Sequence, residues 1–206
     1  MAGHHYAVAG DLLKKRVSYL AVAANGNGSN VSANDNSRFQ KSARLSFVPL
    51  ATASDKLTLG VDGLWTEDTN LAKSDLGLAG NLFTGRRAMR GADLLWTHGS
   101  LDFNAEWLYG TFRPTGAVPA AKFDAEGWQV TAAYFVLPAQ LQAVIKSESF
   151  DPNTSFGGDA IQSTTFGLNY YLRTEDIKIM LNYIDGRVPG SGTDGGRLVG
   201  RVQLVF

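Results

Sequence analysis

The chain has 206 residues, and its 19 Lys and Arg balance its 19 Asp and Glu, which disfavours a nucleic-acid-binding protein. It contains no Cys and three His, which excludes disulfides and thiolate metal sites, and we expect neither a metal nor another cofactor. Its longest apolar run, residues 132–139, has eight residues and includes Pro138, far short of the roughly 18 residues that a transmembrane helix needs.

Alternation of apolar and polar residues, the period of a β-strand, dominates the sequence. In residues 101–111, for example, Leu101, Phe103 and Trp107 share one face. A helical period of 3.6 residues would scatter these side chains around the helix. We therefore predict an all-β antiparallel chain of eleven or twelve strands. Eleven of them run near residues 4–12, 16–24, 38–48, 56–66, 90–98, 101–112, 126–136, 140–149, 162–172, 176–185 and 196–206.

Short and long connections alternate between these strands. Short ones are predicted at 13–15, 49–55, 99–100, 137–139 and 173–175, and longer ones at 25–37, 67–89, 113–125, 150–161 and 186–195. The longer ones are rich in Asn, Asp, Gly and Ser. This alternation is typical of an up-and-down transmembrane β-barrel with short periplasmic turns and longer external loops. A soluble barrel or β-sandwich with an aromatic core is the alternative.

Aromatic side chains occur near the ends of the apolar strand faces. In a membrane barrel such side chains form girdles at the level of the lipid headgroups. We predict this position for Trp65, Trp96, Trp107, Trp128, Tyr109 and Tyr183.

Several segments resemble one family, the phosphate-selective porins O and P. They are GDLLKKRVSYLAVAANGNGSN, SARLSFVPL, GADLLWTHGSLDFNAEWLYGTF, GWQVTAAYFVLP, FGLNYYLRTEDIKIMLNYIDGRV and the closing RVQLVF. They follow one another in the family's order and cover nearly the whole chain, which is similar to the C-terminal portion of these porins. The closing Phe206 looks like the signal by which outer-membrane barrels are recognised for insertion.

The resemblance implies a barrel of 16 strands in the bacterial outer membrane, usually a homotrimer in contact with outer-membrane lipid, that conducts small hydrophilic solutes or anions. The resemblance also implies that residues 1–206 lack about five strands and the inward-folded constriction loop of the family. We expect these 206 residues to form a single transmembrane β-barrel domain. Because the family's N-terminal segment is not matched, no phosphate ligand is carried over. The odd strand count suggests closure by parallel end strands, pairing with another polypeptide, or a longer protein; we favour the last.

For a pore, the charges on the inward face decide which ions pass. The alternation predicts basic pore-lining residues at Arg16, Arg38, Arg44, Lys146, Lys178, Arg197 and Arg201. It predicts acidic ones at Asp62, Asp93, Asp102, Glu106 and Glu148. Lys178 is expected to join Arg197 and Arg201 in a basic strip. The small positive excess indicates a weak anion preference, or else these charges pair and only keep the lumen hydrated.

Other groups of polar residues give little support to a catalytic or metal-binding site. His98 and Ser100 flank a tight turn without a third group to orient them, so we do not expect an enzyme. Asp102 and Glu106 lie too far apart along one strand to share a proton. We expect no metal site in the loop at 151–160, although it contains three residues with side-chain oxygens. We likewise expect His4 and His5 to be ordinary loop or strand residues rather than metal ligands. The loop residues are Asp151, Asn153 and Asp159.

The sequence therefore predicts an outer-membrane porin for small hydrophilic solutes or ions, with a weak, phosphate-like anion preference. The alternative is a structural barrel anchor without channel activity. That alternative needs a plugged lumen, and Leu95, Phe135 and Tyr171 are too few inward apolar side chains to fill a wide barrel.

Overall fold

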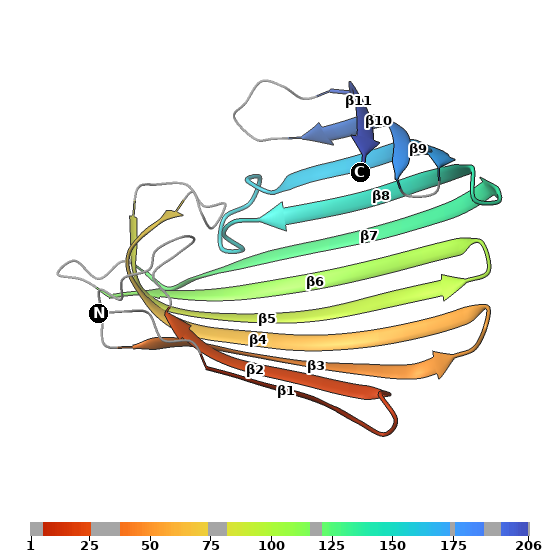
Figure 1. The fold of residues 1–206 in the computed structure, drawn as a ribbon. Coiled ribbons are helices and arrows are strands. Elements are labelled where there is room, and N and C mark those ends of the chain that lie inside the picture. The colour runs from red at the N-terminus through yellow and green to blue at the C-terminus, as the bar shows by residue number, and fades with distance from the viewer. Residues whose placement is uncertain are drawn as a thin grey trace.

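The computed structural model describes residues 6–25, 38–73, 82–115, 121–173, 176–187 and 195–205. They form one antiparallel sheet of eleven strands, each hydrogen-bonded to the next in chain order (Figure 1). The strands are β1 (Tyr6–Leu12), β2 (Val17–Asn25), β3 (Phe39–Ala51), β4 (Asp55–Ala72), β5 (Leu82–His98), β6 (Leu101–Pro114), β7 (Phe123–Leu137), β8 (Leu141–Asp151), β9 (Ile161–Arg173), β10 (Ile177–Arg187) and β11 (Arg197–Leu204). The predicted all-β, up-and-down arrangement is thus confirmed. Within the described ranges, no helix is both long and apolar enough to cross a membrane.

The turns that follow β1, β3, β5 and β7 gather at one end of the sheet, which we call the turn end (Figure 1). The opposite end, where β2, β4, β6, β8 and β10 finish, is the loop end. The prediction of a long connection over residues 67–89 is wrong. β4 continues to Ala72 and β5 begins at Leu82, so both strands extend well past the predicted boundaries toward the loop end.

Cross-strand pairing sorts the side chains onto two faces, because residues directly opposite each other point to the same side. Arg44 pairs with Asp62, and Asp93 with Glu106, on one side, which we call the polar face. Leu45 pairs with Val61, and Leu59 with Leu94, on the other side, the apolar face. The same assignment runs through every pairing from β1 to β11.

The exposure of the two faces is the reverse of that in a soluble sheet. Along β3, Ala43, Leu45 and Phe47 on the apolar face are exposed, whereas Ser42 and Arg44 on the polar face are half-buried. β10 shows the same alternation. A curved sheet covers the side chains on its concave side, so this pattern assigns the polar face to the concave side. The exposed apolar face is the one that needs a non-aqueous surrounding.

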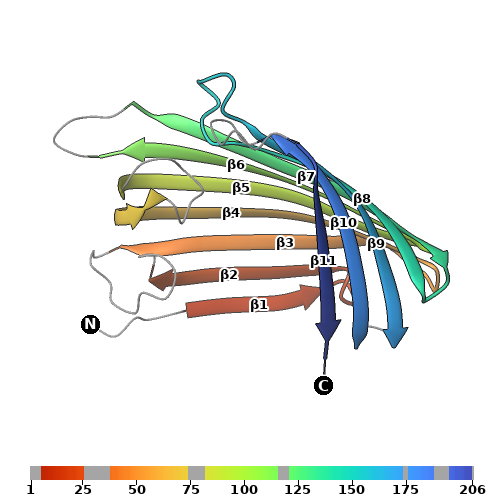
Figure 2. The ribbon, with the colours of Figure 1, turned by 90° about the horizontal axis from the view of Figure 1, so that it is seen from above.

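Strand twist turns the two ends of the sheet to different directions (Figure 2). Figure 2 shows β9, β10 and β11 running at a steep angle to β1, β2 and β3, as strand twist accumulates across the sheet. The described residues show no hydrogen-bonded pairing between β1 and β11, so the sheet is open along these two edges.

An apolar cluster lies at the loop end of the polar face. Phe83 and Phe112 are 1% and 2% exposed, and their rings meet edge to face with centroids 5.6 Å apart. Phe112 also stacks on Phe123, at 4.7 Å between centroids. Met89 and Phe150 pack against the same cluster. This inward aromatic group was not predicted from the sequence.

Candidate functional site

The candidate functional site is the polar face. All five predicted acidic residues lie on it: Asp62, Asp93, Asp102, Glu106 and Glu148. Five predicted basic residues lie there too: Arg44, Lys146, Lys178, Arg197 and Arg201. Leu95, Phe135 and Tyr171 also have this orientation.

The centre of this face carries a three-residue ionic cluster. Arg44 Nη1 lies 3.2 Å from Asp62 Oδ2, and its Nη2 lies 2.5 Å from Asp93 Oδ1. Asp62 is on the adjacent strand, but Asp93 is two strands away, on β5. The guanidinium therefore crosses β4 to reach it, and one cation is shared between two carboxylates.

Two glycines make this crossing possible. A Cβ atom at Gly60 would collide with both the Arg44 guanidinium and the Asp93 carboxylate, and one at Gly91 would lie 2.7 Å from the Asp62 carboxylate oxygens. Real Cβ atoms do not approach other atoms so closely. The Arg44 cluster therefore lies directly on bare backbone at Gly60 and Gly91.

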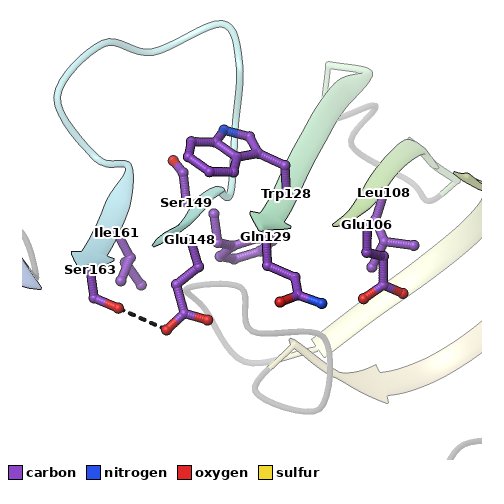
Figure 3. Close-up of a pocket in the computed structure, with 10 residues that line it drawn as sticks. Glu106, Leu108, Trp128, Gln129, Glu148, Ser149, Ile161 and Ser163 are labelled. Atoms are coloured by element: carbon purple, nitrogen blue, oxygen red, sulfur yellow. Dashed lines mark hydrogen bonds between the residues drawn. The ribbon is translucent and has the colours of Figure 1, made fainter. Parts of the chain in front are cut away.

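A row of polar side chains crosses the sheet from Asp93, and each member stands directly opposite the next. This carboxylate row comprises Asp93, Glu106, Gln129, Glu148 and Ser163. In Figure 3 the polar ends of Glu106, Gln129, Glu148 and Ser163 lie on the same side of the strands, while Trp128 and Ser149 lie on the other side. The four members of the row from Glu106 to Ser163 line a hollow of about 350 Å³ together with Leu108 and Phe150.

Hydrogen bonds hold most of this row in place. The Ser163 hydroxyl donates to Glu148 Oε1 at 2.7 Å, and Lys146 Nζ lies 2.5 Å from Glu148 Oε2. Gln129 Nε2 donates to Asn104 Oδ1 at 3.1 Å. Glu106 is exposed and has no ion-pair partner within the described part of the chain. The row therefore presents one carboxylate without an ion pair, Glu106, between two that each contact a cation.

Three of the basic residues lie on the last two strands. Arg197 and Arg201 lie on the polar face of β11, four residues apart, which is roughly 13 Å at about 3.3 Å per residue. Lys178 lies on the same face of β10, opposite Gln203, and its Nζ is 5.1 Å from the centroid of the Tyr171 ring. The predicted basic strip of Lys178, Arg197 and Arg201 thus shares one side of two paired strands. Neither arginine has an acidic partner among the residues that the structure describes.

Two ionic features of this face were not predicted from the sequence. At the loop end, Arg87 and Asp68 form a two-pronged ion pair, with Nε 3.0 Å from Oδ2 and Nη2 3.3 Å from Oδ1. Both side chains are largely covered, at 12% and 1% exposure. Lys56 and Asp11 also have the orientation of the polar face. The described strands therefore carry equal numbers of cations and anions on this face. The cations are Arg44, Lys56, Arg87, Lys146, Lys178, Arg197 and Arg201, and the anions are Asp11, Asp62, Asp68, Asp93, Asp102, Glu106 and Glu148.

Two predicted basic residues are placed differently from the prediction. Arg38 precedes β3, and its Nη1 lies 2.9 Å from Oε2 of Glu67, whose strand position is on the apolar face. Arg16 lies in the turn between β1 and β2, where its Nη1 donates to the Pro49 carbonyl at 3.0 Å. Strand alternation does not fix a side chain outside a strand, which explains both differences.

The six aromatic residues predicted at the membrane interface all lie on the apolar face. Trp107 and Trp128 stand directly opposite each other, and the Trp107 indole donates to Glu126 Oε1 at 2.6 Å. Trp65 lies farther toward the loop end, as does Tyr109, whereas Trp96 lies near the turn end, and Tyr183 lies on β10. Their depth in a membrane stays a prediction.

The remaining candidates form no catalytic or metal-binding group in the described residues. His98 Nδ1 contacts Asp55 Oδ1 rather than Ser100. Asp151 and Asn153 accept hydrogen bonds from amides of their own loop, those of Asn153 and Ser155. No set of three His, Cys, Asp or Glu side chains is arranged to hold a metal ion in these ranges. His4, His5 and Phe206 lie outside the described residues.

An up-and-down antiparallel sheet with a charged concave face and an exposed apolar face has the architecture of a transmembrane β-barrel wall. The family described as phosphate-selective porin O and P matches residues 5–206, and the chain belongs to this family. This confirms the resemblance seen in the sequence. At the level of the family, the protein is a bacterial outer-membrane porin, and a channel is favoured over an enzyme. No match was found among curated proteins.

Proposed function

We propose that the polar face lines a water-filled pore through which small hydrophilic solutes and ions diffuse across the bacterial outer membrane. The observation that carries this proposal is the charged, half-buried concave face opposite an exposed apolar one. A pore wall must hydrate passing solutes while its outside is solvated by lipid.

We further propose a weak anion preference that arises from charge placement rather than from net charge. The polar face is balanced in sign, but three of its cations lie on β10 and β11, where the described strands place no anion on this face. The carboxylate row extends over β5 to β9 and is partly neutralised by Arg44 and Lys146. The basic strip on β10 and β11 has no such neutralisation at Arg197 and Arg201. Fixed cations raise the local anion concentration in a confined pore.

Conductance of the purified full-length protein in planar bilayers tests both statements. We expect open channels. In a salt gradient, we expect a reversal potential whose sign indicates that anions permeate better than cations. Replacing Lys178, Arg197 and Arg201 by Gln is expected to move this potential toward cation selectivity without abolishing conductance. Absence of conductance supports the structural anchor instead, and an unchanged potential contradicts the role of the basic strip.

A matched control removes three positive charges away from the polar face. Lys14 and Lys15 lie in the exposed turn after β1, and Arg187 is exposed on the apolar face at the end of β10. Their replacement by Gln is expected to leave the reversal potential unchanged. A homotrimer, which the family resemblance predicts, is checked by the mass of the protein in detergent.

A further inference from the structure

The apolar face changes character abruptly near the loop end. From the turn end up to the pair Trp107 and Trp128, its positions on β4 to β7 are mostly aliphatic or aromatic, as with Leu59, Leu94 and Val130. Beyond this pair, basic side chains appear on the same face: Lys41 on β3, Arg86 and Arg90 on β5, and Arg113 on β6. A channel lumen cannot explain these charges, because they lie on the opposite side of the sheet from the polar face.

These basic residues line a groove of about 960 Å³, which we call the cationic groove. Trp65, Trp107 and Tyr109 form part of its wall, and the Arg90 guanidinium lies 5.9 Å from the centroid of the Tyr109 ring. Lys41, Arg86, Arg90 and Arg113 are all exposed. The groove therefore combines accessible cations with aromatic side chains, at the loop end of the aliphatic and aromatic part of the apolar face.

Its positive charge exceeds the acidic groups in contact with it. Basic lining residues are Arg38, Lys41, Arg86, Arg87, Arg90, Arg113 and Lys122. The carboxylates that contact lining residues are Glu67, Asp68, Asp124 and Glu126. Glu67 is shared by Arg38 and Arg86, at 2.9 and 3.4 Å. Within the described residues, Lys41, Arg90 and Arg113 form no ion pair, which leaves an excess of three positive charges.

We propose that the cationic groove binds the phosphorylated headgroup of a membrane lipid, whose acyl chains lie along the apolar face below it. Arginine forks match phosphate oxygens, and each cation near an anionic membrane surface adds to the attraction. The apolar band continues from the groove toward the turn end, so a lipid gains contacts that a free phosphate ion does not. This proposal requires membrane placement of the apolar face but not conduction through the polar face.

Binding of bis-phosphorylated lipid A to the full-length protein in detergent, followed by native mass spectrometry, tests the proposal. We expect retained lipid that is displaced as ionic strength rises. We also expect little retention of the same glycolipid after removal of its phosphates. Equal retention of the two forms overturns the proposal, and this comparison uses the unaltered protein. Inorganic phosphate is expected not to compete at concentrations comparable to those of the lipid.

A triple variant identifies the site. Replacing Lys41, Arg90 and Arg113 by Gln is expected to weaken retention of the phosphorylated lipid about a hundredfold, at about 1 kcal/mol for each cation. Gel mobility with and without heating verifies that the variant folds.

The triple variant of Lys14, Lys15 and Arg187 removes the same charge elsewhere and is expected to bind like the unaltered protein. Retention that is unchanged in the groove variant overturns the assignment. So does a groove variant that dissociates into monomers while it still binds lipid, because the groove is then a contact between copies of the chain. Channel conductance measured on the same preparations reports on the pore separately.

Discussion

At the residue scale, the polar face is held together by charges whose partners are fixed by strand register. Arg87 and Asp68 illustrate how much depends on burial. Their two-pronged contact is nearly covered, whereas the neighbouring pair of Arg86 and Glu67 on the opposite face is 65% and 29% exposed. The two pairs join the same two strands, one residue apart, which makes them a natural comparison.

We predict that Asp68→Asn destabilises the folded protein by about 3 kcal/mol, because it leaves a covered guanidinium without its counter-charge. Glu67→Gln removes a carboxylate at the adjacent position and is expected to cost less than about 1 kcal/mol, as exposed pairs do. Urea unfolding of each variant folded in lipid vesicles measures the difference. A cost for Asp68→Asn no larger than that for Glu67→Gln contradicts the structural role of the buried pair.

Ten of the twelve residues predicted to line a pore lie on the polar face, because a residue inside a strand has only two orientations. Arg38 and Arg16 lie outside the strands, where the pleat does not set the direction of a side chain. The sequence also gave no sign that Arg44 crosses β4 to Asp93. That contact depends on the absence of a side chain at Gly60, which a pattern of apolar and polar residues does not register.

At the scale of the strand, the proposed pore requires the two faces to meet different solvents, and adjacent residues of one strand test this directly. Leu59 and Thr58 are neighbours on β4, the first on the apolar face and the second on the polar face. The same substitution at both positions therefore compares lipid with the lumen while strand, depth and backbone are held nearly constant.

We predict that Leu59→Arg costs about 2–4 kcal/mol of folding free energy in a bilayer, as charged residues do on the lipid face of a barrel. Thr58→Arg is expected to cost less than half of that. Folding yield and urea midpoints in vesicles provide the measurement. A larger cost at Thr58 than at Leu59 indicates that the assignment of the two faces is reversed.

The strands that were hardest to delimit from sequence are β4 and β5. β4 extends after residue 66 and β5 begins before residue 90. These extensions carry Glu67, Asp68, Arg86 and Arg87, so both faces of the sheet bear charges there. The part of a strand that extends beyond the hydrocarbon region needs no apolar face. The alternation of apolar and polar residues, by which the strand is recognised in the sequence, is therefore lost there. Eleven strands were nevertheless predicted because each has a stretch with one apolar face.

At the scale of the whole molecule, stability depends on how many neighbours each strand has. β2 to β10 are paired on both sides, whereas β1 and β11 are paired on one side among the described residues. Unpaired backbone groups are costly in lipid, so these edges are the places where the sheet needs a partner.

We predict that amide hydrogen exchange of the chain folded in detergent is slowest in β5 and β6 and fastest in β1 and β11. Opening free energy is expected to fall toward edges that lack a hydrogen-bonded neighbour. Mass spectrometry of peptides from each strand gives the profile. Strong protection of β1 and β11 implies that the two edges are paired in solution, with each other or with another chain.

The bare backbone at Gly60 and Gly91 has a consequence for the width of the conduit. Arg44 and its two carboxylates lie close over the backbone at these glycines, so in the proposed pore they add charge to the wall while narrowing the cross-section little. A methyl group at either glycine would push these groups away from the wall. It would thus constrict the passage while the sum of the charges stays the same.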